Sequence, residues 1–159
     1  DSIHIKEKVY VDGRKIEILP TSQLGLEDKY YQKEPIDIPE APEGPRKSVY
    51  FGEIYGTRSG DKGGCANLGV WAKSNMAYSF LYEFLTVKKL KELLPDLEKY
   101  EIDRYELPNI KSLNFYIHDI LQDGISSNNR KDGQAKSLGE YLGSKLVDVP
   151  DEILKEKII

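Results

Sequence analysis

The residues with the clearest potential for chemistry lie in one glycine-rich stretch between residues 55 and 71. Four glycines and the sequence Arg58-Ser59-Gly60-Asp61-Lys62 separate two runs of strand-like composition, residues 48–55 and 67–73. Glycine lets a backbone approach a ligand closely, and successive amide groups in a turn can form an anion-binding nest. Arg58 and Lys62 would reinforce such a nest, and Asp61 would limit its positive charge. A tight hairpin loop with solvated charges fits the same residues equally well.

Two common phosphate-binding motifs are excluded by their spacing. A Walker loop requires glycine, four residues and then Gly-Lys-Ser/Thr before a helix. Here Gly56 is followed after three residues by Gly60-Asp61-Lys62-Gly63, and a strand-like run comes next. The dinucleotide fingerprint Gly-x-Gly-x-x-Gly at the start of a helix is also absent. A nucleotide site of either kind therefore gains little support.

A second group of polar residues lies in the run 113–120, which is predicted to be a strand. Asn114, Tyr116 and His118 fall on one face because side chains alternate along a strand. An amide and an imidazole on one face could converge on one ligand and polarise a carbonyl group. The alternative is that His118 is a hydrogen-bonded structural histidine.

Several other polar residues have simpler interpretations. Arg104 and Glu106 share a strand face and are expected to pair with each other. Asn109 follows a proline and is interpreted as a turn residue. Cys65 lacks an activating neighbour in the sequence and is interpreted as a small buried thiol.

The segment 122–133 is polar and unusually long for a loop in a compact domain, so it is either functional or disordered. Within it, Arg130 and Asp132 either pair or contact a ligand. Lys136 and Ser137 are predicted to begin the last long helix, where they are also placed to bind an anion.

Composition limits the class of protein. The 159 residues suit one domain with an additional arm, and the formal net charge of −4 argues against a general nucleic-acid binder. One cysteine excludes an intrachain disulfide, and two histidines without a ligand-like spacing give no metal site. No signal peptide and no membrane-spanning apolar run is found, so a cytoplasmic protein is expected.

The chain divides into three regions. Residues 1–46 are predicted to form a β-hairpin, with Asp12-Gly13 as a type I′ turn, and then a proline-rich arm. This arm is expected to lie on the domain or on a partner, with Tyr30, Tyr31, Ile36 and Ile38 as anchors, or else to remain mobile. Residues 47–150 hold the main domain, and residues 151–159 form a frayed tail with Ile158 and Ile159 exposed.

Inside the main domain the hydrophobic pattern predicts strands and helices in two similar halves. Helix signals are clear at Ser74, an expected N-cap, at Thr86, where a second helix starts, and at Pro95, which stops it. The expected strands are 48–55, 67–73, 101–107 and 113–120, and the helices are 74–85, 86–94 and 135–146, after which residues 147–150 return toward the sheet. This order indicates an α+β two-layer sandwich, a four-stranded antiparallel sheet with helices on one face.

Several of these motifs, in this order, resemble the small C-terminal domain of AtuA-like proteins, the acyclic terpene utilisation family. The resemblance covers residues 49–149 and consists of Gly56-Thr57-Arg58-Ser59-Gly60-Asp61-Lys62-Gly63, Ala66-Asn67-Leu68-Gly69-Val70, Arg104-Tyr105-Glu106-Leu107-Pro108-Asn109, Leu113-Asn114-Phe115 with His118, and Arg130-Lys131-Asp132-Gly133-Gln134-Ala135-Lys136-Ser137-Leu138-Gly139. Gly64-Cys65 stands where the family usually has Asp-Asn, and the later glycine-rich run is reduced to Asp123-Gly124.

The resemblance implies a ferredoxin-like fold that is normally fused behind a much larger domain, so this chain resembles the small subunit of a split protein. Family members are associated with the breakdown of branched or terpenoid acids as coenzyme A thioesters. We therefore expect an oligomer with a larger AtuA-like subunit, an acyl-CoA substrate of hydratase or lyase chemistry, and no cofactor beyond the coenzyme A of that substrate. The expected catalytic residues are Asp61, Asn114 and His118, and the expected substrate-binding residues are Arg58, Ser59, Gly60, Lys62, Gly63, Asn67, Arg130 and Lys136.

Two other functions remain open at this point. The chain could be a noncatalytic interaction module, in which the proline-rich arm wraps a partner and the glycine-rich stretch shapes an interface. It could also be a small enzyme that works alone, with its cleft built from one sheet and a few helices.

Overall fold

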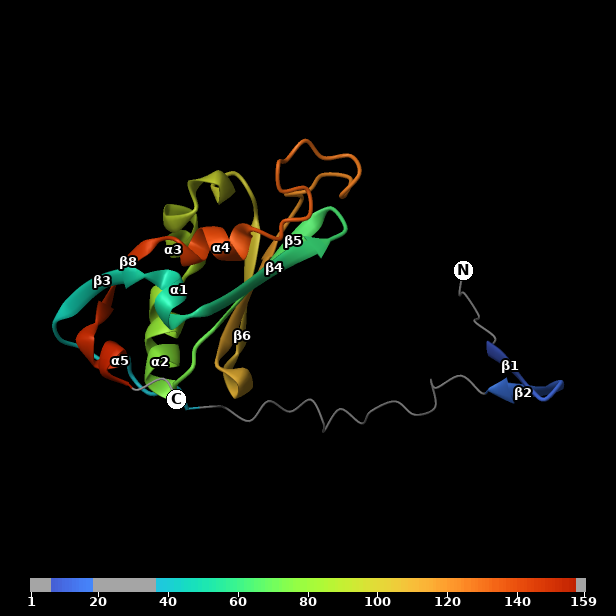
Figure 1. Cartoon of the computed structure of the whole chain (residues 1–159), viewed down its shortest axis with the longest axis horizontal. Helices are drawn as coiled ribbons and strands as arrows, with labels where there is room; N and C mark the ends of the chain where they lie inside the picture. The colour runs from blue at the N-terminus through green and yellow to red at the C-terminus, as the bar shows by residue number, and fades with distance from the viewer. Residues whose placement is uncertain (1–6, 19–36, 157–159) are drawn as a thin grey trace. The chain divides into compact units, whose positions relative to one another are not determined.

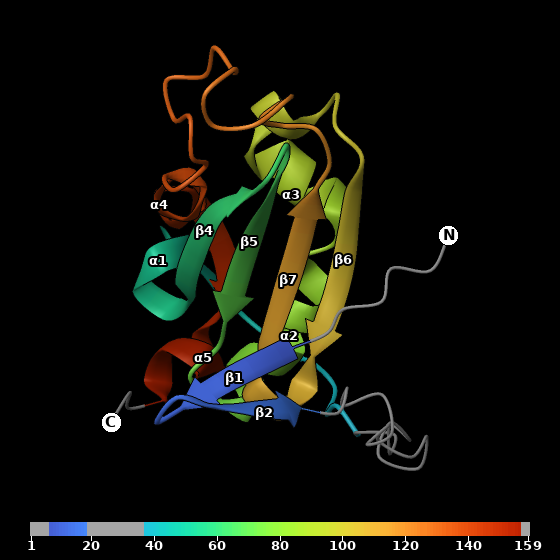
Figure 2. The same cartoon turned by 90° about the vertical axis from the view of Figure 1, so that its right-hand side faces the viewer.

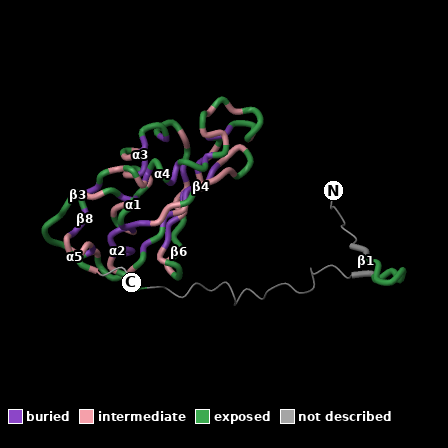
Figure 3. The backbone as a smooth tube through the Cα atoms, in the orientation of Figure 1, coloured by how far each residue is buried: buried purple, intermediate pink, exposed green. Residues whose placement is uncertain are grey.

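The computed structural model describes residues 7–18 and 37–156 of the chain. The chain divides into two compact units, Asp1–Pro35 and Ile36–Ile159, and each is described by itself. Tyr30, Tyr31, Ile36, Ile158 and Ile159, which the sequence singled out, lie outside the described residues. Figure 3 shows that buried residues are concentrated in the second unit, whereas the described side chains of the first are exposed.

The first unit contains a two-stranded hairpin. Strand β1 (Glu7–Val11) pairs with β2 (Arg14–Ile18), and Asp12 and Gly13 both have positive φ in the turn between them. Two positive φ values are the signature of a type I′ turn, so the predicted hairpin and its turn are confirmed.

The second unit consists of a four-stranded sheet, a two-stranded sheet and short helices (Figure 1). Its elements in chain order are β3 (Arg46–Tyr50), α1 (Phe51–Ile54), β4 (Gly56–Lys62), β5 (Cys65–Trp71), α2 (Asn75–Phe84), α3 (Val87–Leu93), the 3₁₀ turn η3 (Pro95–Leu97), β6 (Ile102–Leu107), the 3₁₀ turn η4 (Pro108–Ile110), β7 (Ser112–Ile117), α4 (Leu138–Gly143), β8 (Leu146–Pro150) and α5 (Asp151–Lys155).

The four-stranded sheet is antiparallel, with the strand order β4-β5-β7-β6. Figure 2 shows the four strands side by side, with α2 and α3 behind them. Alternate residues of β5 and β7 point into the core against these helices, among them Leu68, Val70, Leu113, Phe115 and Ile117, which are all fully buried. The predicted α+β, ferredoxin-like sandwich with helices on one face of the sheet is confirmed.

Helices α2 and α3 begin where the sequence indicated. The Ser74 hydroxyl accepts a hydrogen bond from the Ala77 amide at 3.0 Å, which caps α2. The Thr86 hydroxyl caps α3 in the same way through the Lys89 amide at 3.1 Å. Pro95 then ends the helical pattern by starting η3. None of the helices in the described ranges has the length and hydropathy needed to cross a bilayer.

The strand predicted for residues 48–55 is wrong over its second half. The strand β3 ends at Tyr50, and residues 51–54 form one helical turn, α1. Phe51 and Ile54 are both buried, and their spacing of three residues is a helical period rather than the period of two of a strand. The Glu53 carboxylate accepts a hydrogen bond from the Tyr50 amide and fixes the start of this turn.

The glycine-rich stretch is a strand and not a loop, which corrects the predicted anion-binding nest. Residues 56–62 form β4 and pair with β5 from Gly56 opposite Trp71 to Lys62 opposite Cys65. Only Gly63 and Gly64 turn the chain, and Gly63 has a φ of +64°. A nest requires successive amides that point into one concavity, whereas the amides of a strand alternate in direction.

The end of the domain also differs from the prediction. The strand β8 pairs with β3 in a separate two-stranded sheet and does not join the four-stranded sheet. The last long helix is limited to α4, residues 138–143, because Asp132 fixes the backbone of Lys136 and Ser137 before it. Ile38, one of the predicted anchors of the arm, is partly buried against the core of the second unit.

Candidate functional site

One face of the four-stranded sheet is left open by the helices of its own unit. We call it the open face, and Figure 2 views the sheet from this side. Directly opposed residues of antiparallel strands share a face, so the register orders the open face in rows across β4, β5, β7 and β6. Each row is given in the strand order β4, β5, β7, β6. The first row is Lys62, Cys65, His118 and Glu101, of which the last two lie just outside their strands. The next three rows are Gly60, Asn67, Tyr116 and Asp103; then Arg58, Gly69, Asn114 and Tyr105; and finally Gly56, Trp71, Ser112 and Leu107.

Six of the eleven predicted site residues lie on this face. Three come from β4 and three from the two central strands or the residue after them: Arg58, Gly60, Lys62, Asn67, Asn114 and His118. These residues are exposed or half-buried, whereas the residues that alternate with them on β5 and β7 are buried. On β4 the alternate residues Ser59 and Asp61 are themselves half-buried. The predicted shared face of Asn114, Tyr116 and His118 is thus present in the structure.

Asn114 and His118 are separated along their strand. Four residues at about 3.3 Å each place them about 13 Å apart, so a single ligand that contacts both must be extended. Asn114 is closer to Asn67, whose amide Nδ2 donates to Asn114 Oδ1 at 3.3 Å. Gly60 and Gly69 lie in the same two central rows and place no side chain on the face, which leaves room there for a ligand.

Ser59 and Asp61 lie on the other side of β4, opposite the core residues Leu68 and Ala66. The Ser59 hydroxyl accepts a hydrogen bond from the Gly139 amide of α4 at 3.1 Å. This contact explains the serine as a structural residue that holds α4 on the sheet. Gly63 forms the turn after β4 and presents no side chain to either face.

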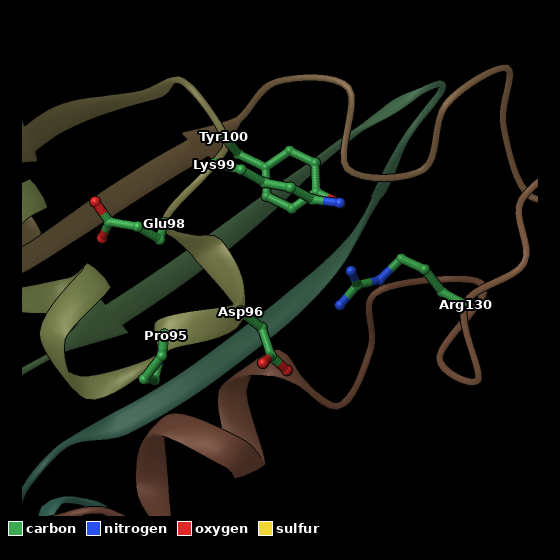
Figure 4. Close-up of a pocket in the computed structure, with 6 residues that line it drawn as sticks. All are labelled: Pro95, Asp96, Glu98, Lys99, Tyr100 and Arg130. Atoms are coloured by element: carbon green, nitrogen blue, oxygen red, sulfur yellow. The ribbon is translucent and has the colours of Figure 1, made fainter.

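Arg130 and Lys136 come from the long segment before α4 and do not belong to the open face. Arg130 lines a shallow depression of about 420 Å³ together with Pro95, Asp96, Glu98, Lys99 and Tyr100 (Figure 4). The carboxylates of Asp96 and Glu98 balance the cations of Lys99 and Arg130, so the depression has no net positive charge that would attract phosphate groups.

The start of α4 already holds an internal anion. The Asp132 carboxylate accepts hydrogen bonds from the Lys136 amide at 2.9 Å, the Ser137 amide at 2.9 Å and the Ser137 hydroxyl at 2.7 Å. Partial burial disfavours the charged carboxylate, but the hydrogen bonds from Ser137 and Lys136 outweigh it and lower the pKa of Asp132. An external anion would therefore have to displace Asp132.

His118 has a partner that the sequence did not indicate. Its Nε2 lies 2.8 Å from Oδ2 of Asp103, a residue of the neighbouring strand β6. The hydrogen bond to Asp103 raises the pKa of His118, and desolvation opposes this effect only in part. The Tyr116 ring lies edge-on to the imidazole, with ring centroids 4.9 Å apart and an interplanar angle of 82°. The sequence predicts a strand that contains Asp103, and the period of two gives the face on which Asp103 lies. It does not give the register of this strand against β7, so the contact with His118 could not be predicted.

The opposite end of the open face is apolar. Trp71, Tyr105 and Leu107 on this face have exposed fractions of 41, 52 and 42%, and Ile110 in the η4 turn that follows β6 is 65% exposed. The Trp71 indole lies against Gly56, where an added Cβ would come within 2.1 Å of its Cε2 atom. Glycine at this position therefore allows the indole to lie flat on the sheet, which makes Trp71 a fixed and exposed aromatic surface.

The structure confirms the simpler interpretations of Arg104 and Asn109 but not that of Cys65. The predicted pairing of Arg104 with Glu106 is confirmed, and Arg104 also donates to the Tyr82 carbonyl at 2.7 Å. Asn109 lies in the η4 turn, as predicted. Cys65 is half-buried on the open face and not fully buried, because it is the first residue of β5 next to the turn. A hydrogen bond with Cys65 raises the pKa of Tyr116.

Within residues 7–18 and 37–156, no group of three or more His, Cys, Asp or Glu side chains is arranged to hold a metal ion. The functional groups of the open face are two cations, two amides, an imidazole, the carboxylates of Asp103 and Glu101, the Cys65 thiol, the Ser112 hydroxyl and aromatic rings. This set can bind anions, donate hydrogen bonds and transfer protons.

Comparison with known families gives one match. The sequence model described as the AtuA ferredoxin-like domain matches residues 50–148, which include all of β4 to α4. No curated protein and no solved structure matches this chain.

Proposed function

Because the chain belongs to the AtuA ferredoxin-like domain family, we propose that it is the small subunit of an acyl-CoA-processing enzyme of hydratase or lyase type. In this proposal the open face meets a larger AtuA-like subunit, and its polar end contributes side chains to a shared substrate site. The substrate class is the coenzyme A thioester of a branched or terpenoid acid, and the single cysteine supports a reducing compartment such as the cytoplasm.

The observation that carries the proposal is the one-sided sheet. The helices of the unit leave this face open, and it has an apolar end and a polar end. The apolar end is suited to contact with a partner, and the polar end is suited to a ligand. The depression at Arg130 is shallow and carries mixed charge, so it is not suited to enclose a thioester. In this proposal the larger subunit supplies the walls that complete the site.

The roles of the residues follow from their positions. Arg58 and Lys62 are exposed on the same face of β4 and supply positive charge for the phosphates of coenzyme A. Gly60 and Gly69 carry no side chains and leave an open path from the two cations to the central strands. Asn67 and Asn114 offer amide donors along this path. An extended ligand such as a pantetheine chain fits the spacing of these groups better than a compact one.

The test is reconstitution of the complex with its larger subunit, isolated by affinity purification of this chain from its own organism. Arg58→Ala and Lys62→Ala should each raise KM for the acyl-CoA about tenfold without loss of assembly, as expected when one charge-assisted contact is removed. Lys47→Ala is the matched control, because Lys47 is an exposed cation on β3, outside the four-stranded sheet. Unchanged turnover and KM in both variants would refute the shared site.

A noncatalytic interaction module is the second candidate, and the exposed apolar group Trp71, Tyr105, Leu107 and Ile110 favours it specifically. If this candidate is correct, substitutions on the open face weaken assembly and leave the turnover of assembled complex unchanged. Deletion of residues 1–35, the whole first unit, separates the contribution of the arm from that of the open face.

A further inference from the structure

The polar end of the open face contains a histidine and a carboxylate in direct contact. His118 Nε2 and Asp103 Oδ2 are 2.8 Å apart, and the two side chains are 34% and 45% exposed. Such a pair is reachable by a ligand and yet has a fixed partner for one ring nitrogen. No hydrogen-bond partner of the other nitrogen, Nδ1, occurs among the described residues.

The surroundings fix the position of the imidazole. The His118 amide donates to the Glu101 carbonyl at 3.0 Å, which ties the residue after β7 to the start of β6. The next amide, that of Asp119, donates to Cys65 Sγ at 3.5 Å. The Tyr116 ring packs edge-on against the imidazole. Backbone, ring and carboxylate thus hold His118 from three sides.

We propose that His118 and Asp103 form a proton-donating pair for the acyl-CoA reaction, in which His118 gives the proton and Asp103 is its positioning residue. This inference rests on the proposed function, because it assigns a step to the shared site. Asp103 engages Nε2 and so leaves Nδ1 as the nitrogen that exchanges protons with the substrate.

The step can be written for elimination of water from a hydroxyacyl thioester. A base, which we assign to the larger subunit, removes the α proton, and the electron pair of that C–H bond forms the new C=C bond. The C–O bond breaks and its electron pair moves to oxygen, which takes the proton from His118 Nδ1 and leaves as water. The imidazole becomes neutral and keeps its proton on Nε2, which donates a hydrogen bond to Asp103 Oδ2. Hydration runs through the same steps in reverse.

The charged groups around His118 favour its protonated form. Asp103 on β6, Glu101 before β6 and Asp119 after β7 are carboxylates, and each raises the pKa of His118. Cys65 on β5 and Lys62 at the end of β4 occupy the same row of the open face. A histidine that is protonated more readily than usual is suited to act as an acid near neutral pH.

The first experiment is an NMR titration of the isolated full chain, which reports on the pair without any partner. The chain has two histidines, so His118→Gln assigns the resonances. Asp103→Asn should lower the pKa of His118, and Asp103→Glu should largely restore it. Glu106→Gln is the matched control, since Glu106 lies on the same strand and pairs with Arg104. An unchanged His118 titration in Asp103→Asn would overturn the pairing.

The second experiment measures kcat against pH in the reconstituted complex, with hydroxyacyl-CoA thioesters as substrates and enoyl-CoA absorbance as the readout. His118→Gln should lower kcat about 100-fold. Asp103→Asn should lower kcat about tenfold and move the basic limb of the kcat–pH profile to lower pH. Asp103→Glu should keep kcat and the pH profile close to those of wild type. A normal pH profile in Asp103→Asn, despite a shifted NMR titration, would overturn the proton-donor role alone. An inactive wild-type complex would overturn the proposed function itself.

Discussion

At the scale of single residues, the alternation of strand β4 decides which predicted residues are available to a ligand. Arg58, Gly60 and Lys62 lie on the open face, whereas Ser59 and Asp61 between them lie on the side of the helices. Ser59 could pass for a ligand-binding hydroxyl in the sequence, yet it accepts the Gly139 amide and so holds α4. The five consecutive residues 58–62 thus alternate between the open face and the side of the sheet that the helices cover.

Asp132 provides a first prediction about stability. Its carboxylate accepts three hydrogen bonds at the start of α4, so Asp132→Ala should lower the free energy of unfolding by about 1 kcal/mol at neutral pH, as for loss of a helix cap. Because the folded-state pKa of Asp132 is lowered, this stabilisation is present above its unfolded pKa and is lost as the pH falls through the folded pKa. Urea denaturation at neutral and acidic pH measures both effects. Asp123→Ala, an exposed carboxylate in the same segment, is the control and should change little.

His118 provides a second prediction, with the opposite pH dependence. Its pKa is raised in the folded state, so the stabilisation is complete below the unfolded pKa of about 6.5 and is lost as the pH rises through the folded pKa. Wild type should therefore exceed His118→Gln in urea midpoint at pH values below about 6, and the difference should shrink in alkaline buffer. A difference that is constant with pH would show that packing against Tyr116, and not charge, is the contribution of His118.

At the scale of elements, the sequence predicted those whose ends carry chemical signals. Ser74, Thr86 and Pro95 mark α2 and α3 correctly, because caps and proline act locally. Strand β4 was mistaken for a loop, because its glycines and charges lack strand propensity and only pairing with β5 makes it a strand. The partner of β8 was missed for the same reason, since pairing between distant strands is not a local property.

The contact of α4 with β4 gives a third prediction. A Cβ at Gly139 would lie 3.1 Å from Thr57 Oγ1 and 3.3 Å from the Arg58 amide nitrogen, so the helix has no space for a side chain there. Gly139→Val should lower the free energy of unfolding by about 1–3 kcal/mol through overpacking. Thermal and urea denaturation measure the change.

Gly60→Val is the matched control for this substitution. Gly60 lies on the open face of β4, and a Cβ there would meet nothing within 4 Å. Valine favours strands, so the variant should be as stable as wild type or slightly more stable. Equal destabilisation by both substitutions would mean that the close approach of α4 to β4 is not the cause of the effect of Gly139→Val.

At the scale of the whole molecule, the second unit is a sandwich with only one of its two faces closed. Its core holds large side chains between the sheet and α2, α3 and α4, and it includes the partly buried Ile38 at the start of the unit. The apolar end of the open face contributes nothing to this core. The core does not account for the exposed Trp71, whereas the proposed partner surface would.

Trp71 therefore gives the last prediction, on assembly with the larger subunit that we propose. It is the only tryptophan of the chain and is 41% exposed, so its fluorescence reports directly on the open face. Docking should shift its emission to shorter wavelength as the indole loses water.

Trp71→Ala should weaken assembly by about 2 kcal/mol, close to 30-fold in Kd, as for an aromatic residue at the centre of an interface. Gly56→Ala should weaken assembly as well, because the new methyl group displaces the indole from the sheet. Tyr50→Ala, which removes an exposed aromatic side chain from β3, should leave Kd unchanged. Unaltered emission on assembly, with equal Kd for Trp71→Ala and wild type, would place the partner on another surface and remove the apolar end of the open face from the interface.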